Sequence, residues 1–318
     1  MNGVEGMSGM ALDILIVGAG VAGMEAARVA AAEGAKVLVV ERMGPGGQVA
    51  TVDRITNFPG HDEIGGFELG PMLQDAADEA GAEFVLSEVA ALAPVAGGWR
   101  AAVDGTPLDA RCVILACGSE RRALGVPGES AYAGRGVSHC ASCDGGFFRG
   151  ETVVVVGGGD SALDEALVLA PMVGSVVLVL RWTEFRATQG QETALAGQPN
   201  ITVLRETEVI EVQGDDSGMT GVVLRDGGGT RVLPARGLFV YVGLTPRTAL
   251  AEGLAERDQD GRLVVSGRME TTAPGLFAAG DIRQGSRALL AEALEDGQKA
   301  ARAALGFLQT GLAAGQQG

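Results

Sequence analysis

Two segments of this chain each combine an apolar strand, a glycine-rich turn and an alanine-rich stretch of helical character. The first, ALDILIVGAGVAGMEAARVAAAEGAKVLVVER, places Gly18, Gly20 and Gly23 in the pattern G-x-G-x-x-G directly after a strand. Glycines there permit a tight turn and let the backbone approach a pyrophosphate, which the N-terminus of the next helix attracts. The returning strand ends at Glu41, where a carboxylate can accept hydrogen bonds from a ribose 2′-hydroxyl. This segment therefore predicts a dinucleotide-binding βαβ unit.

The second segment, ETVVVVGGGDSALDEALVLAPMVGSVVLVLRWTEFR, repeats the arrangement with a different end. Gly157, Gly159 and Ala162 give G-x-G-x-x-A after a strand, but Leu180 and Arg181 stand where the first segment has its acid. A carboxylate suits a free 2′-hydroxyl, whereas arginine suits a 2′-phosphate. We therefore expect an FAD-like nucleotide at the first unit and an NADP-like nucleotide at the second. The alternative is a degenerate duplicate whose arginine is merely solvated.

Length and composition set the class of protein. The chain has 318 residues, 47% of them hydrophobic, and 51 glycines, which fits a two-domain α/β protein with many tight turns. The net charge of −16 argues against a nucleic-acid partner. No apolar run approaches the ~20 residues that span a bilayer, so no membrane association is expected. Residues 1–10, MNGVEGMSGM, lack the pattern of a secretory signal and are interpreted as a flexible leader, which favours a cytoplasmic, reducing compartment.

Two further apolar strands, at 110–118 and 273–281, end in glycine turns that include Gly118 and Gly280. Asp281 closes the second and is placed to bind a sugar or ribityl hydroxyl, although a plain turn aspartate is the alternative. Connectors rich in glycine and proline near 118–128 and 243–246 suggest linkers. We therefore expect one domain to be discontinuous, with the second unit inserted into it.

The stretch SHCASCDGGFFRG holds Cys140 and Cys143, followed by Asp144. A redox disulfide, half of a metal site, or two small buried residues could each explain the pair. Zinc needs four ligands, but Cys112 and Cys117 fall along a predicted strand and its turn, so no metal site is expected. A dithiol two residues apart can close a small ring, its thiolate is a nucleophile, and a neighbouring carboxyl can exchange the proton. The redox interpretation is the one that uses all three residues.

Together these residues resemble the low-molecular-weight thioredoxin reductases of bacterial type, which are FAD-dependent pyridine nucleotide-disulfide oxidoreductases. Besides the first glycine motif, the matching segments are GGQ (46–48), NFPG (57–60), CxxCDG (140–145), GGGDSA (157–162), FRA (185–187) and FAAGD (277–281). The resemblance implies a homodimer of chains with two Rossmann-like three-layer nucleotide-binding domains, one inserted into the other. It places an FAD-binding domain at 11–120 and 244–318 and an NAD(P)H-binding domain at 121–243.

The resemblance also implies a path for electrons, from NADPH through FAD and the dithiol to a thioredoxin-like protein or a small disulfide. In this scheme Cys143 faces the flavin, Cys140 attacks the external disulfide, and Asp144 exchanges the proton. The expected FAD-binding residues are Gly18, Gly20, Gly23, Glu41, Gly47, Gln48, Asn57, Gly118, Gly280 and Asp281. The expected NADPH-binding residues are Gly157, Gly159, Asp160, Ser161, Ala162, Arg181 and Arg186.

Two segments depart from the family pattern. The pyridine-nucleotide box H-R-R-x-x-x-R reads LRWTEFR, so Trp182 replaces the middle arginine and Leu180 the histidine. The flavin-proximal YRQA reads SRALL, at 286–290. NADH or another electron donor is therefore an alternative to NADPH. A ferredoxin-fed reductase, a dithiol oxidase that uses oxygen, and a nucleotide-binding module with a regulatory CxxC remain alternatives. The GGGDSA motif favours the reductase, because an oxidase needs no second nucleotide.

Overall fold

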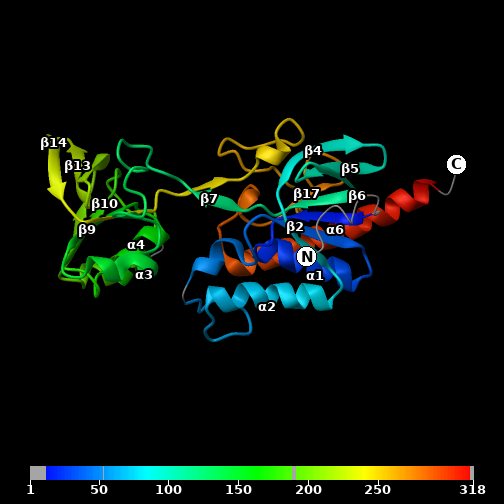
Figure 1. Ribbon diagram of the computed structural model, residues 1–318, viewed down its shortest axis with the longest axis horizontal. Helices are drawn as coiled ribbons and strands as arrows, with labels where there is room; N and C mark the ends of the chain where they lie inside the picture. Colours follow the sequence, from blue (N-terminus) through cyan, green and yellow to red (C-terminus); the bar gives the residue numbers. More distant parts are fainter. Residues whose placement is uncertain (1–11, 53, 188–190, 316–318) are drawn as a thin grey trace. The chain divides into compact units, whose positions relative to one another are not determined.

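The structure is a computed structural model that describes residues 12–52, 54–187 and 191–315, with side chains up to residue 310 (Figure 1). The leader expected at residues 1–10 lies outside the described residues. The described chain forms two compact units. The first consists of the segment up to Glu120 together with the segment from Thr245 onward, and the second spans Arg121–Leu244. Both contain a largely parallel sheet with helices, which confirms the predicted α/β class.

The first unit is built on a seven-stranded sheet in the order β3-β2-β1-β6-β5-β4, with β17 also paired to β6. Strands β1, β2, β3, β6 and β17 run parallel, and β4 and β5 add antiparallel pairs. The strands are β1 (Leu12–Val17), β2 (Val37–Glu41), β3 (Glu83–Leu86), β4 (Val89–Val95), β5 (Gly98–Val103), β6 (Thr106–Leu115) and β17 (Leu276–Ala278).

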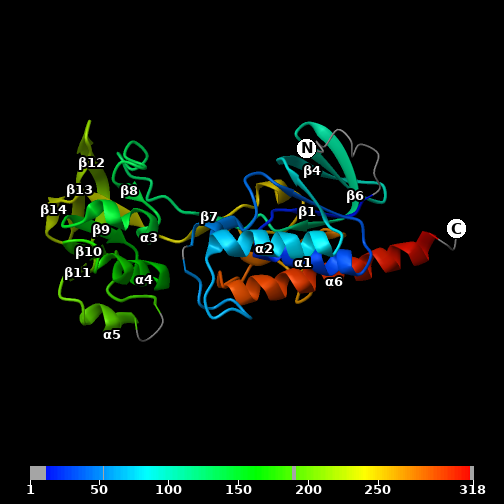
Figure 2. The ribbon, with the colours of Figure 1, turned by 60° about the horizontal axis from the view of Figure 1, so that its bottom comes forward.

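Helices α1 (Val21–Ala32), α2 (Gly66–Glu79) and α6 (Leu290–Gly315) lie together on one side of this sheet, as Figures 1 and 2 both show. Strand side chains alternate between the two faces. Ile14 and Ile16 are fully buried in the cluster that includes the helices, whereas Leu15 is fully buried in the cluster that includes Trp99 of β5. Small residues along α1 let this helix pack closely against the sheet and against α6.

The second unit has a five-stranded parallel sheet in the order β11-β10-β9-β15-β8 and a three-stranded antiparallel sheet, β12-β13-β14. Apolar clusters lie on both faces of the parallel sheet, which explains its runs of valine. The strands are β8 (Val137–Ser138), β9 (Thr152–Val156), β10 (Ser175–Val179), β11 (Ile201–Leu204), β12 (Glu208–Asp215), β13 (Gly218–Asp226), β14 (Gly229–Pro234) and β15 (Gly237–Val240). The helices are α3 (Ala141–Asp144), α4 (Asp160–Leu169) and α5 (Gln191–Ala196).

The chain passes between the units along β7 (Ser119–Arg121) and β16 (Leu244–Pro246), which pair with each other. Short 3-10 helices occur at Gly47–Thr51, Gly145–Phe148, Ala249–Ala251 and Gly280–Ile282. Within the ranges given above, we find no helix with both the length and the apolar character needed to cross a membrane.

Candidate active site

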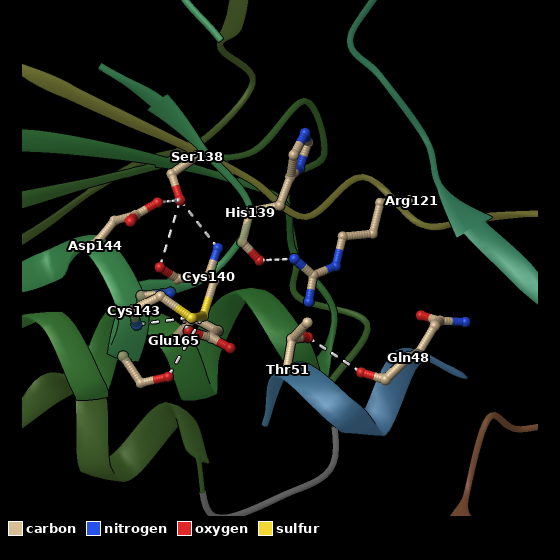
Figure 3. The surroundings of a disulfide bond; sticks show 11 residues. Gln48, Thr51, Arg121, Ser138, His139, Cys140, Cys143, Asp144 and Glu165 are labelled. Carbon is tan, nitrogen blue, oxygen red and sulfur yellow. Dashed lines mark hydrogen bonds between the residues drawn. A yellow bond between two sulfur atoms is a disulfide. The ribbon is translucent and has the colours of Figure 1, made fainter. Parts of the chain in front are cut away.

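The cysteine pair forms a disulfide at the start of α3, in the second unit. Cys140 caps the helix and its sulfur is bonded to that of Cys143 (Figure 3). The backbone N–H of Cys143 donates to Cys140 Sγ at 3.2 Å, so the helical turn itself brings the two sulfurs together. Cys143 is exposed and Cys140 is partly buried. The pair therefore stands at a surface where a second disulfide can reach it.

Ser138 links Asp144 to the cysteine pair, and no sequence pattern had singled it out. Its buried hydroxyl donates to Asp144 Oδ2 at 2.6 Å and accepts from the backbone N–H of Cys140 at 3.1 Å (Figure 3). The Asp144 carboxyl is thus held by the last residue of β8. The signal in the sequence was a hydroxyl two residues before a cysteine, which is too common to be informative.

A second carboxyl, that of Glu165 on α4, also reaches the cysteine segment. Its Oε2 accepts from the backbone N–H of Ala141 at 3.0 Å, and Ala141 directly follows Cys140. Burial raises the pKa of the Glu165 carboxyl, and the hydrogen bond from the Ala141 amide lowers it by less than burial raises it. Sequence analysis missed this residue, because one acid on a helix of mixed polarity predicts only a solvated face.

In the first unit, the loop after β1 is shaped by glycine. Gly18 has φ +107°, and a Cβ atom on it would lie 2.4 Å from the carbonyl oxygen of Ala116. A Cβ atom on Gly23 would lie 2.0 Å from the carbonyl oxygen of Gly18. Gly20 is the N-cap residue of α1. A Cβ atom on Gly20, unlike one on Gly18 or Gly23, would have no other group within 4 Å. Two glycines permit close packing, and the third leaves open space at a helix N-terminus, which suits a pyrophosphate.

Glu41 ends β2 beside this loop. Its Oε2 accepts from the backbone N–H of Ala19 at 2.8 Å, and its Oε1 accepts from that of Met43 at 2.9 Å. These bonds fix the carboxylate at the mouth of the βαβ unit. Each oxygen keeps a lone pair with which it could accept from a ribose hydroxyl.

Gln48 and Asp281, far apart in sequence, meet through Ser119. Gln48 Nε2 donates to the Ser119 hydroxyl at 3.0 Å and to Asp281 Oδ2 at 3.4 Å, and Ser119 Oγ donates to the same Asp281 oxygen at 3.3 Å. Ser286 Oγ donates to Asp281 Oδ1 at 3.3 Å. Burial raises the pKa of the Asp281 carboxyl, although the two hydroxyl donors oppose it.

The remaining expected FAD-binding residues lie in loops of the same unit. Gly47 has φ +58°, and a Cβ atom on it would lie 3.2 Å from Gly20 Cα, so these two glycines are neighbours. Gly118 follows β6, and Gly280 begins the 3-10 helix that carries Asp281. Asn57 is exposed and lies in a loop without regular secondary structure. The structure thus brings the Gly18 loop and Gly47 together and leaves Asn57 on the surface.

The loop after β9 resembles the first glycine loop. Gly157 has φ +146°, and a Cβ atom on it would lie 2.3 Å from the carbonyl oxygen of Tyr241. Ala162 is fully buried on α4, which begins with Asp160 and the exposed Ser161. Gly159 caps this helix, and a Cβ atom on it would meet no other group within 4 Å. This site too offers an open helix N-terminus.

Arg181 and Arg186 both stack on Trp182. Their guanidinium carbons lie 4.7 and 4.5 Å from the centre of the indole ring. The backbone N–H of Arg186 donates to the carbonyl oxygen of Gly158 at 2.6 Å, which places this arginine's backbone beside the glycine loop. The residue that replaces the family's middle arginine therefore contacts both of the arginines that remain.

The other two cysteines are free thiols in the first unit. Burial raises the pKa of both Cys112 and Cys117 to about 12. Cys117 Sγ lies 3.5 Å from the carbonyl oxygen of Val17. Among the residues with described side chains, no group of three or more His, Cys, Asp or Glu could hold a metal ion.

Comparison with known proteins bears directly on this arrangement. Residues 12–298 match the family of pyridine nucleotide-disulphide oxidoreductases. The chain belongs to this family. It is 38% identical to the thioredoxin reductase of Treponema pallidum over 301 residues, which cover 94% of this chain and 97% of the relative. It is 42% identical over 275 residues to that of Mycolicibacterium smegmatis, which cover 85% of this chain and 88% of the relative.

Solved structures agree with the sequence matches. The crystal structure of Lactococcus lactis thioredoxin reductase superposes with a TM-score of 0.89 at 34% identity, over 94% of this chain and 99% of that chain. The predicted resemblance is therefore confirmed, as is the fold of two Rossmann-like parts. Membership of the family means that the enzyme is an oxidoreductase that uses a flavin, a pyridine nucleotide and a reactive disulfide.

Proposed function

We propose that this protein is a thioredoxin reductase in which electrons pass from NADPH to FAD, then to the Cys140–Cys143 pair, and finally to the disulfide of a thioredoxin-like protein. The observation that carries the proposal is the Cys140–Cys143 disulfide, exposed at Cys143, with Asp144 held beside it in the same unit as the second glycine loop. A structural disulfide would not need a carboxyl fixed next to it. The relatives named thioredoxin reductases support the choice of substrate.

The two cysteines, Asp144 and the substrate disulfide account for the bonds, electrons and protons in the proposed thiol–disulfide exchange. In the reduced enzyme the Cys140 thiolate attacks a substrate sulfur, which forms a mixed disulfide and releases the second substrate sulfur as a thiolate. Asp144 supplies the proton that this leaving thiolate takes up. Cys143, whose proton passes to the Asp144 carboxylate, then attacks Cys140 Sγ, which reforms the enzyme disulfide and releases the remaining substrate sulfur as a thiolate that takes up this proton. The substrate gains two electrons and two protons, and the enzyme dithiol loses them.

The first unit has the residues to hold FAD. The open space at Gly20 would admit the pyrophosphate, Glu41 would accept from the adenosine ribose, and Asp281 would accept from the ribityl chain. Gly18, Gly23, Gly47, Gln48, Asn57, Gly118 and Gly280 complete the proposed site. When bound, the flavin supplies two-electron transfer between a reduced nicotinamide and the disulfide.

The second unit has the residues to hold NADPH. Gly157, Gly159, Asp160, Ser161 and Ala162 would form the pyrophosphate loop, and Arg181 and Arg186 would bind the 2′-phosphate. Because both guanidinium groups also stack on Trp182, we expect a modest preference for NADPH over NADH. The proposal further includes residues 11–120 with 244–318 as the FAD domain, residues 121–243 as the NADPH domain, a homodimer and a cytoplasmic location.

Anaerobic titration of the purified yellow protein tests the proposal. We expect released cofactor to be FAD by chromatography, NADPH to bleach the flavin, and oxidised thioredoxin to restore its colour. A protein that releases FMN would contradict the assignment of Glu41. If dithionite bleaches the flavin but neither NADPH nor NADH does, the enzyme is a ferredoxin-fed reductase or a dithiol oxidase instead.

A further inference from the structure

Glu165, which no part of the proposed mechanism uses, lies beneath the cysteine pair. It belongs to α4, and Figure 3 shows its side chain beside the two cysteines. Its carboxyl accepts a hydrogen bond from the Ala141 amide, one peptide bond away from Cys140. The side chain is half-buried, in contrast to its exposed neighbour Asp164. The carboxyl thus reaches the backbone between the two cysteines from a different element.

Charged and titratable groups from three elements face this carboxyl. Tyr241 lies just after β15. Its hydroxyl is buried and has no hydrogen-bond partner among the described residues. Burial first, and then the Glu165 charge, raises the pKa of this phenol. Arg121 of β7 lies near enough to lower the pKa of Glu165, and Asp164 of the same helix raises it. Arg121 also donates to the carbonyl oxygen of His139, next to Cys140.

We propose that Glu165 is a positioning residue for the dithiol: its carboxylate fixes the turn between Cys140 and Cys143 and its negative charge disfavours the Cys140 thiolate. A charge held this close to a forming thiolate repels it. Whatever disfavours the thiolate stabilises the disulfide relative to the reduced form. The pair is then a stronger reductant, which suits an enzyme that gives electrons away. This inference rests on the proposed function and adds a residue to it.

The test compares full-length holoenzyme variants by alkylation of the reduced protein with iodoacetamide across a range of pH. Glu165→Gln keeps an oxygen that can accept from the Ala141 amide but removes the charge, and Glu165→Ala removes both. We expect both variants to increase the rate constant at Cys140 about 3- to 10-fold at pH 7, since a tenfold change needs only ~1.4 kcal/mol. The midpoint of the pH profile should fall. Asp164→Asn is the matched control and should stay within about twofold of the wild type.

Two results would count against different claims. If Glu165→Gln has the pH profile of the wild type while Glu165→Ala does not, the residue only anchors the turn and the inference is wrong. If the wild-type cysteines cannot be cycled between disulfide and dithiol at all, the proposed function is wrong. Peptide mass mapping identifies which cysteine is alkylated, and it needs no turnover, flavin reduction or substrate protein.

Discussion

The hydroxyl of Ser138 donates a 2.6 Å hydrogen bond to the carboxylate of Asp144, and the five residues between them in sequence include both cysteines. Because the same hydroxyl accepts from the Cys140 amide, it ties the carboxyl to the cysteine turn. The position of Asp144 is therefore set by β8 as well as by its own helix.

Asp144→Asn should lower kcat for reduction of a protein disulfide by about 10²-fold, because proton transfer by a positioned group contributes 10² or more. Reduction of the flavin by NADPH should be unchanged, since Asp144 serves only the thiol steps. Ser138→Ala should lower kcat less, because the carboxyl remains. Ser217→Ala, an exposed serine that donates to Asp215, is the control. Equal rates for Asp144→Asn and the wild type would remove Asp144 from the mechanism.

Two glycines of the first loop should respond differently to alanine. Gly23→Ala places a Cβ atom 2.0 Å from a backbone oxygen, so we expect a loss of about 1–3 kcal/mol or more in unfolding free energy. Gly20→Ala meets no neighbour and has φ −73°, so its apoprotein should fold as the wild type does. It should nevertheless bind FAD at least tenfold more weakly, because the methyl group fills the open space. Thermal melts and flavin titration measure the two effects, and normal FAD affinity for Gly20→Ala would contradict the proposed site.

The glycine loops and Glu41 could be predicted because a βαβ unit fixes their separation locally. The same holds for Cys140, Cys143 and Asp144, which share one turn. Ser119, Ser138 and Glu165 could not be predicted, since each acts through a residue on another element and carries no motif of its own. The meeting of Gln48 with Asp281 depends on β17 pairing with β6, which a sequence pattern does not determine.

Arg181→Ala should raise the KM for NADPH more than the KM for NADH. Loss of one charge-assisted contact to the 2′-phosphate costs ~1.5–3 kcal/mol, which is about 10- to 100-fold. The control, Arg100→Ala, removes an exposed arginine that pairs with Asp109 in the first unit and should change neither KM. Equal changes in the two KM values would show that Arg181 does not bind the phosphate.

Alkylation should distinguish the four cysteines. Because burial raises the pKa of Cys112 and Cys117 to about 12, both stay protonated as the pH rises through 8. Their thiolate fraction at pH 8 is on the order of 10⁻⁴, from the one-decade-per-unit titration law. In the reduced native protein, iodoacetamide should label Cys140 and Cys143 alone, and in denaturant it should label all four. Rapid native labelling of Cys117 would mean that its thiol is accessible and reactive.

The most direct test of the account is the fate of the Cys143→Ser variant mixed with a thioredoxin-like protein. Cys140 should attack the partner and then find no second thiol to release it, so a mixed disulfide should accumulate as a mass shift that reduction removes. The reciprocal Cys140→Ser variant should form no such species. Full turnover by Cys143→Ser would contradict the dithiol mechanism, whereas trapping by Cys140→Ser alone would reverse the two roles.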